Sequence, residues 1–247
     1  MSADRKIVAT IEARMGSSRL PGKVLKEIQG KAMLEMMIER ARRAETLDGI
    51  VVATTTSPAD DAIVEVAQRA GVGCYRGSEL NVMSRVLEAA LAYGADLIVE
   101  LTGDSPLIDP AIIDETVNAF LAGDYDYVAN VLERTYPIGM DVQVFSTAIL
   151  ADAASRTDDP IDHEHVSLYI YRHPEFYKVH NLVAAKKLTR PDLRLTLDTP
   201  QDLALIRNLF DSLYPDNPTF SLADIIAYLD ANPVVAALNA GVQQRVV

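Results

Sequence analysis

The chain of 247 residues contains a single cysteine, Cys74. One thiol cannot form an intramolecular disulfide, and it excludes a metal cluster held by cysteine alone. Long apolar runs are missing too, since none approaches the roughly 20 apolar residues of a membrane-spanning helix. The run after Lys6 is short and is interrupted by Glu12 and Arg14, which does not fit a signal peptide. We therefore expect a cytoplasmic protein with no membrane partner.

Positive charge is also in short supply. The chain has 23 Lys and Arg against 35 Asp and Glu, a net charge of −12. Because such a chain repels nucleic-acid backbones, we expect no nucleic-acid partner. The first 50 residues nevertheless carry +3, while the remaining 197 carry −15. This distribution indicates a small anionic ligand near the N-terminal end. The hydrophobic content of 49% is that of a globular chain and excludes disordered and collagen-like classes.

Short β-branched runs alternate with helical patterns in the first 130 residues. This alternation is typical of βαβ units and a mostly parallel sheet. No linker, repeat or charge block divides the chain, so residues 1–247 are predicted to form a single α/β domain with an α+β C-terminal elaboration. We expect strands at 6–13, 49–54, 96–101, 125–130, 141–145, 176–183 and 194–197. We expect helices at 32–44, 60–70, 82–93, 109–121, 146–156, 162–172, 200–213 and 221–231, and a helix or strap after residue 232.

The segment 13–23 (ARMGSSRLPGK) leaves the first expected strand, where open α/β sheets bind their ligands. Its glycines and serines allow backbone N–H groups to converge on an anion, and Arg14, Arg19 and Lys23 supply positive charge. The alternative is a basic turn in solvent. Three cations on a Gly/Ser loop after the first strand favour an anion-binding loop.

Two known phosphate-binding motifs do not fit this loop. A P-loop requires the pattern G-x4-G-K-[ST], whereas five residues separate Gly16 from Gly22, and Val24 follows the lysine. The magnesium-binding hydroxyl is therefore missing. A dinucleotide fingerprint fails as well, because the G-x-G at 71–73 continues to Gly77, one residue too far.

Two aspartates follow expected strands. Asp104 comes after the strand at 96–101, and Asp198 follows the short run at 194–197. Carboxylates at these points would face the same crevice as the basic loop, and Mg²⁺ prefers one or two carboxylates together with phosphate oxygens and water. Each aspartate also precedes an expected helix, so each could instead be an N-terminal cap. The residues alone leave both interpretations open.

Other chemistries are not supported. The four histidines lie between 163 and 180, but the D-H-E-H at 162–165 lacks the H-E-x-x-H spacing of zinc sites. The D-x-D at 124–126 opens an expected strand and more simply marks a turn. There is no G-x-S-x-G motif, and Cys74 has no histidine nearby in sequence. The absence of a nucleophile fits phosphoryl chemistry, in which catalysis is mainly positioning and charge neutralisation.

The segment 13–25 (ARMGSSRLPGKVL) closely resembles the N-terminal signature of the nucleotide-sugar cytidylyltransferases, which make CMP-activated sugar acids, and of their spore-coat polysaccharide relatives. Further similar segments follow in the same order, so that the resemblance runs from about residue 6 to 210. They are IVVAT at 50–54, RGS at 76–78 with Val82 and Arg85, and LTGDSPLIDP at 101–110. The segments YPIGMDVQVF at 136–145, EHV at 164–166 and RLTLDTPQDL at 194–203 are similar to the spore-coat branch in particular.

This resemblance implies a Rossmann-like, glycosyltransferase-A-like nucleotidyltransferase fold and a homodimer. It implies transfer of CMP from CTP to a sugar acid or another small anionic acceptor of the phosphate or phosphonate type, with release of pyrophosphate, in surface polysaccharide or glycan synthesis. Mg²⁺ is the expected cofactor. The alternatives are a guanylyltransferase that uses GTP and an amino-sugar 1-phosphate, and a catalytically silent nucleotide-binding module.

The expected site follows from the matching positions. Arg14, Lys23 and Asp104 are the expected catalytic residues, and Asp104 and Asp198 the expected metal ligands. The expected nucleotide-binding residues are Ala13, Gly16, Ser17, Ser18, Arg19, Ala53, Thr54, Arg76, Gly77 and Ser78. The expected acceptor-binding residues are Gly139, Asp141, Glu164 and His165.

Overall fold

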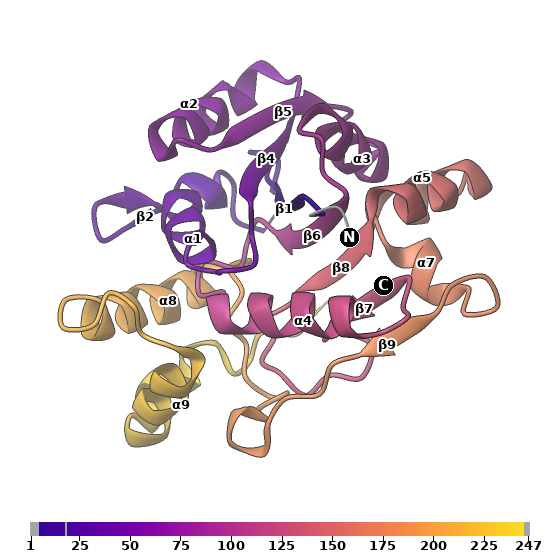
Figure 1. Ribbon diagram of the computed structural model, residues 1–247. Coiled ribbons are helices and arrows are strands. Elements are labelled where there is room, and N and C mark those ends of the chain that lie inside the picture. The colour runs from indigo at the N-terminus through magenta and orange to yellow at the C-terminus, as the bar shows by residue number, and fades with distance from the viewer. Residues whose placement is uncertain (1–4, 18, 245–247) are drawn as a thin grey trace.

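The fold is built on one seven-stranded β-sheet with helices on both faces (Figure 1). The computed structural model describes residues 5–17 and 19–244. The strands run across the sheet in the order β5-β4-β1-β6-β8-β7-β9. Because β1 pairs in parallel with β4 and β6, and β4 with β5, this half of the sheet is parallel, as predicted. The strands are β1 (Ile7–Glu12), β4 (Gly49–Thr55), β5 (Gly73–Gly77), β6 (Leu97–Thr102), β7 (Tyr127–Ala129), β8 (Gln143–Ser146) and β9 (Val179–Asn181).

The other half of the sheet is mixed. β8 runs antiparallel to both β6 and β7, and β9 is parallel to β7. This half is the α+β elaboration that the sequence predicts. A separate two-stranded hairpin, β2 (Glu27–Ile28) and β3 (Lys31–Ala32), was not predicted; it lies between the loop at 13–23 and the first long helix.

Two hydrophobic cores, one on each face of the sheet, separate the helices into two layers. Along β1 the side chains alternate between these cores: Ala9 and Ile11 enter the first and Val8 the second. Glu12 therefore points to the side of the second core. The first core packs under the helices α1 (Met33–Ala41), α2 (Asp61–Ala70), α4 (Pro110–Ala122), α8 (Pro200–Leu213) and α9 (Leu222–Ala231). The second core packs under α3 (Val82–Ala92), α5 (Thr147–Arg156) and α7 (Leu168–Arg172).

The predicted helix at 162–172 is in fact two short helices, α6 (Pro160–Glu164) and α7. The buried residue between them, Val166, has a φ of +41°, a conformation that β-branched side chains rarely adopt. The chain therefore turns sharply after His165, and this turn packs on the face of the second core, where Ser167 donates to Gln143 of β8.

The predicted strand at 194–197 is wrong. Within the described residues this segment makes only an isolated bridge, between Arg194 and Ile138. It packs instead against Gly139, which has a φ of +97° and where a Cβ atom would lie 2.7 Å from the backbone of Leu195 and Thr196. Only glycine allows the two segments to approach so closely.

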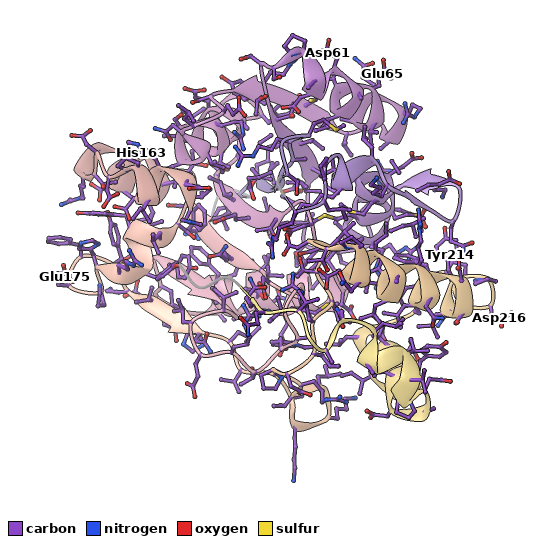
Figure 2. The ribbon with its side chains drawn as sticks, turned by 180° about the vertical axis from the view of Figure 1, so that it is seen from behind. Asp61, Glu65, His163, Glu175, Tyr214 and Asp216 are labelled. Carbon is purple, nitrogen blue, oxygen red and sulfur yellow. The ribbon has the colours of Figure 1, made fainter. Side chains whose placement is uncertain are left out.

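After α9 the chain folds back in α10 (Pro233–Ala236) and a 3₁₀ turn, η4 (Ala237–Asn239), which contacts α8. Asn239 is buried there. Charged side chains such as those of Asp61, Glu65, Glu175 and Asp216 lie at the rim of the molecule (Figure 2). Among the helices that the structure describes, none has the length and apolar character required to span a membrane.

Candidate active site

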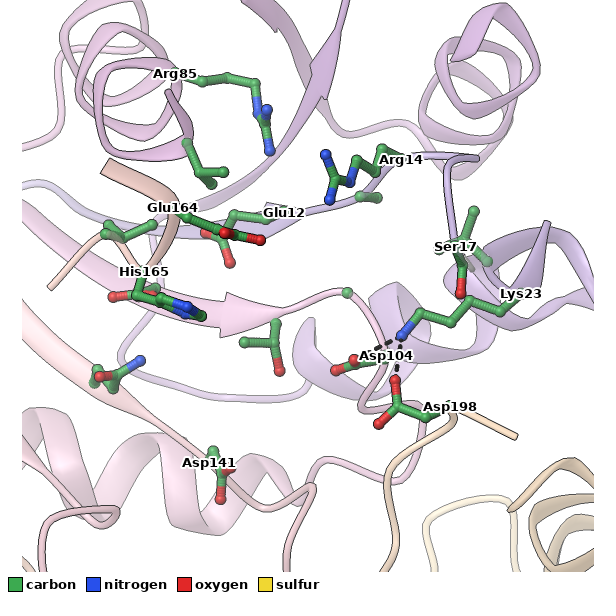
Figure 3. A pocket seen from close by; sticks show the side chains of 18 of the residues that line it. Glu12, Arg14, Ser17, Lys23, Arg85, Asp104, Asp141, Glu164, His165 and Asp198 are labelled. Carbon is green, nitrogen blue, oxygen red and sulfur yellow. Dashed lines mark hydrogen bonds and ion pairs between the residues drawn. The ribbon is translucent and has the colours of Figure 1, made fainter. Parts of the chain in front are cut away.

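A cleft of about 470 Å³ opens at the carboxyl ends of β1 and β6 (Figure 3). The register of the sheet explains its position, because Glu12, at the end of β1, pairs with Thr102, at the end of β6. The loops that follow these two strands therefore begin side by side. The cleft lining includes eleven of the residues expected from the sequence: Ala13, Arg14, Gly16, Ser17, Arg19, Lys23, Asp104, Asp141, Glu164, His165 and Asp198.

Lys23 joins the two predicted metal ligands. Its ammonium donates hydrogen bonds of 2.8 Å to Asp104 Oδ2 and of 2.8 Å to Asp198 Oδ1. Arg19 adds a second cation, 3.0 Å from Asp198 Oδ2. Burial by itself would lower the pKa of Lys23, but the two carboxylates outweigh it and raise that pKa above its ordinary value. Three segments that are far apart in the sequence thus meet at one cluster of charges.

A buried network holds Asp198 in place. Arg194 donates to Asp198 Oδ2 at 2.6 Å and to Asp202 Oδ1 at 2.9 Å, and Asp202 is fully buried. Burial alone would raise the pKa of Asp198, but Lys23, Arg194 and Arg19 outweigh it and hold that pKa below its ordinary value. Asp198 therefore stays an anion in the cleft.

The helix-cap interpretation of the two aspartates is excluded by the geometry. Thr199, not Asp198, is the N-cap of α8 and forms a capping box with Asp202. Asp109, not Asp104, caps α4 through a hydrogen bond from the backbone N–H of Ala111. Both side chains are therefore available to the cleft.

Gly103 brings the loop after β6 against β1. Its backbone N–H donates to the carbonyl oxygen of Glu12 at 3.0 Å, and a Cβ atom at this position would lie only 2.2 Å from the same oxygen. Since any side chain would push the loop away, glycine here places Asp104 at the mouth of the cleft.

A second pair of carboxylates, Glu12 and Glu100, lines the cleft on the face of the second core. Glu100 is 4% exposed, and its Oε2 atom has no hydrogen-bond partner within the described residues. Burial raises the pKa of Glu100 to about 8. Burial and then the neighbouring Glu100 raise the pKa of Glu12, against a smaller opposing effect of Arg85. We did not predict either residue as functional.

On the far wall of the cleft, Arg134 forms a two-point ion pair with Asp141, at 2.7 and 3.2 Å. Burial raises the pKa of Asp141 in spite of this partner. Glu164 and His165 reach the cleft from the turn between α6 and α7, next to Val166. The positively charged loop and these acidic side chains therefore occupy different parts of one cavity.

Comparison with known proteins identifies the family. The sequence profile described as "Cytidylyltransferase" matches residues 8–228. The chain belongs to the cytidylyltransferase family. It is 34% identical over 238 residues to the spore coat polysaccharide biosynthesis protein SpsF of Bacillus subtilis, covering 93% of this chain and 96% of that protein. It is 34% identical over 182 residues to the 3-deoxy-manno-octulosonate cytidylyltransferase of Anaeromyxobacter dehalogenans, covering 68% of this chain and 74% of that protein.

The fold agrees with the family. A solved cytidylyltransferase structure from Leptospira borgpetersenii superposes with a TM-score of 0.90 at 32% identity, covering 98% of this chain and 99% of that chain. The predicted Rossmann-like nucleotidyltransferase fold is therefore confirmed, as is the resemblance to the spore-coat branch and the enzymes that make CMP-activated sugar acids.

Several expected nucleotide-binding residues of this cytidylyltransferase do not line the cleft. Ala53 and Thr54 are buried within β4. Arg76, on β5, donates to Asp61 Oδ1 at 2.6 Å and to the carbonyl oxygens of Thr55 and Ser57 at 2.8 Å each. It therefore fastens the end of β5 to the segment after β4. That Ala53, Thr54 and Arg76 contact the nucleotide base stays a prediction.

Three further expected residues lie elsewhere. Gly77 is buried against Arg85, and Ser78 accepts a hydrogen bond from the backbone N–H of Asn81. Gly139 packs against the 195–196 backbone rather than lining the cleft. Ser18 falls outside the described residues.

The residues that we missed share one sequence signal. Glu100 is the single charged side chain in the buried apolar run of β6, LIVELT, and Arg194 opens the run that leads to Asp198. A charged residue is rarely buried without a partner or a function. That signal marks Glu100 even without a structure.

Proposed function

We propose that this cytidylyltransferase transfers the CMP group of CTP to a sugar acid, or to another phosphate- or phosphonate-type acceptor, and releases pyrophosphate. The observation that carries the proposal is the position of Lys23, whose ammonium bridges Asp104 and Asp198 at the base of the Gly/Ser loop. Phosphate-binding groups and carboxylates that can hold a cation therefore meet at one point of the cleft. Such an arrangement suits chemistry at a triphosphate.

The reaction begins when a lone pair of the acceptor oxygen attacks the α-phosphorus of CTP. The bond from this phosphorus to the bridging oxygen breaks, and its electron pair leaves on the pyrophosphate. Arg14, Lys23 and the backbone N–H groups at 16–17 would bind the β- and γ-phosphates and balance the charge on the leaving group. Arg14 is well placed for this task because its one ion pair within the described residues, with Glu79 at 4.0 Å, joins two exposed side chains.

Asp104 and Asp198 would hold a divalent cation, for which we propose Mg²⁺. The donor set fits, because both carboxylates already converge on one positive charge, and Mg²⁺ commonly binds to one or two carboxylates plus phosphate oxygens. When bound, the cation would neutralise charge on the α-phosphate. Lys23 would then exchange its carboxylate partners for phosphate oxygens of the incoming CTP.

The acceptor would bind on the side of Asp141, Glu164 and His165. A phosphate or phosphonate acceptor arrives ionised and needs no general base, whereas the hydroxyl group of a sugar acid must lose its proton. The relationship to SpsF, described as a spore coat polysaccharide biosynthesis protein, supports a role in surface polysaccharide synthesis. A homodimer and a cytoplasmic location remain predictions from the sequence.

Release of pyrophosphate from each nucleoside triphosphate, with and without Mg²⁺, tests the proposal. We expect release with CTP and Mg²⁺, and a loss of about 100-fold or more in Asp104→Asn, because the substitution removes the charge that faces the cation. Asp124→Asn is the matched control, since Asp124 is exposed and its one ion pair among residues 5–17 and 19–244 is with Lys178. Release with GTP alone would favour a guanylyltransferase, and binding of CTP without release would favour a silent nucleotide-binding module.

A further inference from the structure

Carboxyl groups without an ion-pair partner collect at one side of the cleft. Figure 3 shows Glu12, Glu164 and His165 across the cleft from Lys23, Asp104 and Asp198. The three aspartates of the cleft all have ion-pair partners within 4.0 Å. Of the lining glutamates Glu12, Glu100 and Glu164, none has such a partner within residues 5–17 and 19–244. This side of the cavity therefore has carboxyl groups that no described cation contacts within 4.0 Å, although Arg85 also lines it.

Glu100 is the most isolated of these groups. It projects from β6 on the same face as Glu12, one step further from the strand ends, because Thr10 pairs with Glu100 and Glu12 with Thr102. Glu12 Oε1 has a neighbour in the Thr10 hydroxyl at 3.3 Å. The Oε2 atom of Glu100, by contrast, is buried and accepts no hydrogen bond within the described residues.

An unpartnered carboxylate oxygen in a buried position is costly unless a ligand supplies its partner. Within the described residues, no side chain donates to Oε2. The Gln143 carbonyl oxygen already accepts hydrogen bonds from Tyr127, at 2.5 Å, and from Ser167, at 2.8 Å. Arg85 is drawn aside by a hydrogen bond of 2.5 Å to the carbonyl oxygen of Ser78. Hydrogen bonding from Ser167 and Gln143 opposes the rise in the Glu100 pKa, but the Oε2 atom is left without a partner within the described residues. A ligand in the cleft can supply this donor.

We propose that Glu12 and Glu100 form a subsite for a protonated amine carried by the acceptor. This inference rests on the proposed function and narrows its acceptor. An ammonium group supplies N–H donors for the unpartnered oxygen, and its positive charge favours the ionised form of both carboxyl groups. A hydroxyl group supplies a donor alone. The acceptor is then zwitterionic, with its anionic attacking group toward the α-phosphorus of CTP and its amine toward β6.

Matched acceptors that differ only in an amine or a hydroxyl group test this subsite. The pairs are 2-aminoethylphosphonate with 2-hydroxyethylphosphonate, and glucosamine 1-phosphate with glucose 1-phosphate. We expect kcat/KM for pyrophosphate release from CTP to be at least about tenfold higher for the amine of a pair, in line with hydrogen bonds to charged groups. Glu100→Gln should remove most of this preference by lowering kcat/KM for the amine only.

Glu175→Gln is the matched control, because Glu175 is exposed at the rim of the molecule (Figure 2). It should leave the preference unchanged. Equal kcat/KM for the amine and hydroxyl members in the wild type would overturn the subsite, and so would an equal fall for both in Glu100→Gln. The proposed transfer stands in either case, because pyrophosphate is still released from CTP.

If neither acceptor of a pair reacts, each is titrated into the CTP-loaded protein in a calorimeter, and the affinities of the amine and hydroxyl members are compared. Tighter binding of the amine, lost in Glu100→Gln, supports the subsite, and equal binding or no binding contradicts it. Failure of the proposed function looks different, since no acceptor would then release pyrophosphate.

Discussion

At the scale of single residues, the site depends on how each charge is compensated. Lys23 and Arg194 keep Asp198 ionised. Lys23 also holds the side chain of Asp104 in position through a hydrogen bond. Glu100 has no such cation, and burial raises its pKa to about 8. The sequence motifs identified the compensated aspartates. They do not include Glu100, which the sequence marks only as a charged residue within an apolar run, and whose burial depends on the packing of β8 and α7 around the strand.

The raised pKa of Glu100 predicts how stability changes with pH. Its ordinary pKa of 4.5 applies in the unfolded chain, whereas the folded chain holds the proton up to about pH 8. The folded state therefore binds more protons between these values, and the free energy of unfolding falls as pH rises through this window. The slope from one group is at most about 1.4 kcal/mol per pH unit.

Glu100→Gln removes this group without changing its shape. We expect the variant to lose less stability than the wild type between pH 5 and pH 8, with a constant difference above pH 8. Urea unfolding at a series of pH values measures both slopes, with Glu175→Gln as the control. Parallel slopes for wild type and Glu100→Gln would show that the Glu100 carboxyl does not hold a proton in the folded state.

At the scale of elements, the alternation of strands and helices predicted the parallel half of the sheet. It missed β5, which starts and ends at glycine and has a half-buried, unpatterned sequence. It also extended one helix through Val166 and placed a strand at 194–197, where tertiary packing prevails over local pattern. Close approaches of the backbone, such as those at Gly103 and Gly139, leave no periodic signal in a sequence.

Gly103→Ala tests the contact between the loops after β1 and β6. The new methyl group would lie 2.2 Å from the carbonyl oxygen of Glu12, so the loop must move and carry Asp104 with it. We expect a loss of about 1–3 kcal/mol in the free energy of unfolding, as for other overpacked sites, and a clear fall in kcat. Chemical denaturation and the pyrophosphate assay measure the two effects.

Gly49→Ala is the control for this substitution. Gly49 is the first residue of β4, and a Cβ atom there would meet no atom of the described residues within 4 Å, its chain neighbours apart. Its stability and kcat should stay close to those of the wild type. A Gly103→Ala variant that behaves like this control would mean that the loop tolerates a side chain and that Gly103 does not position Asp104.

At the scale of the whole molecule, the chain has a net charge of −12, whereas its loop at 13–23 is positively charged. Lys23, Asp104 and Asp198 come from the first, middle and last thirds of the chain and meet only in the fold. The C-terminal segment contributes as well: Asn239 donates to Asp202 Oδ1 at 2.8 Å and to the carbonyl oxygen of Arg194 at 2.9 Å. The cleft is therefore a product of the complete fold.

In the proposed reaction, CMP moves from CTP to the acceptor and pyrophosphate leaves. The position of a phosphorus label tests it most directly. CTP labelled at the α- or γ-phosphate is incubated with the protein, Mg²⁺ and the panel of acceptors. We predict that the α-label appears in a product joined to the acceptor and that the γ-label appears in pyrophosphate. Transfer of the γ-label to an acceptor, or bound CTP that is never consumed, would contradict the account.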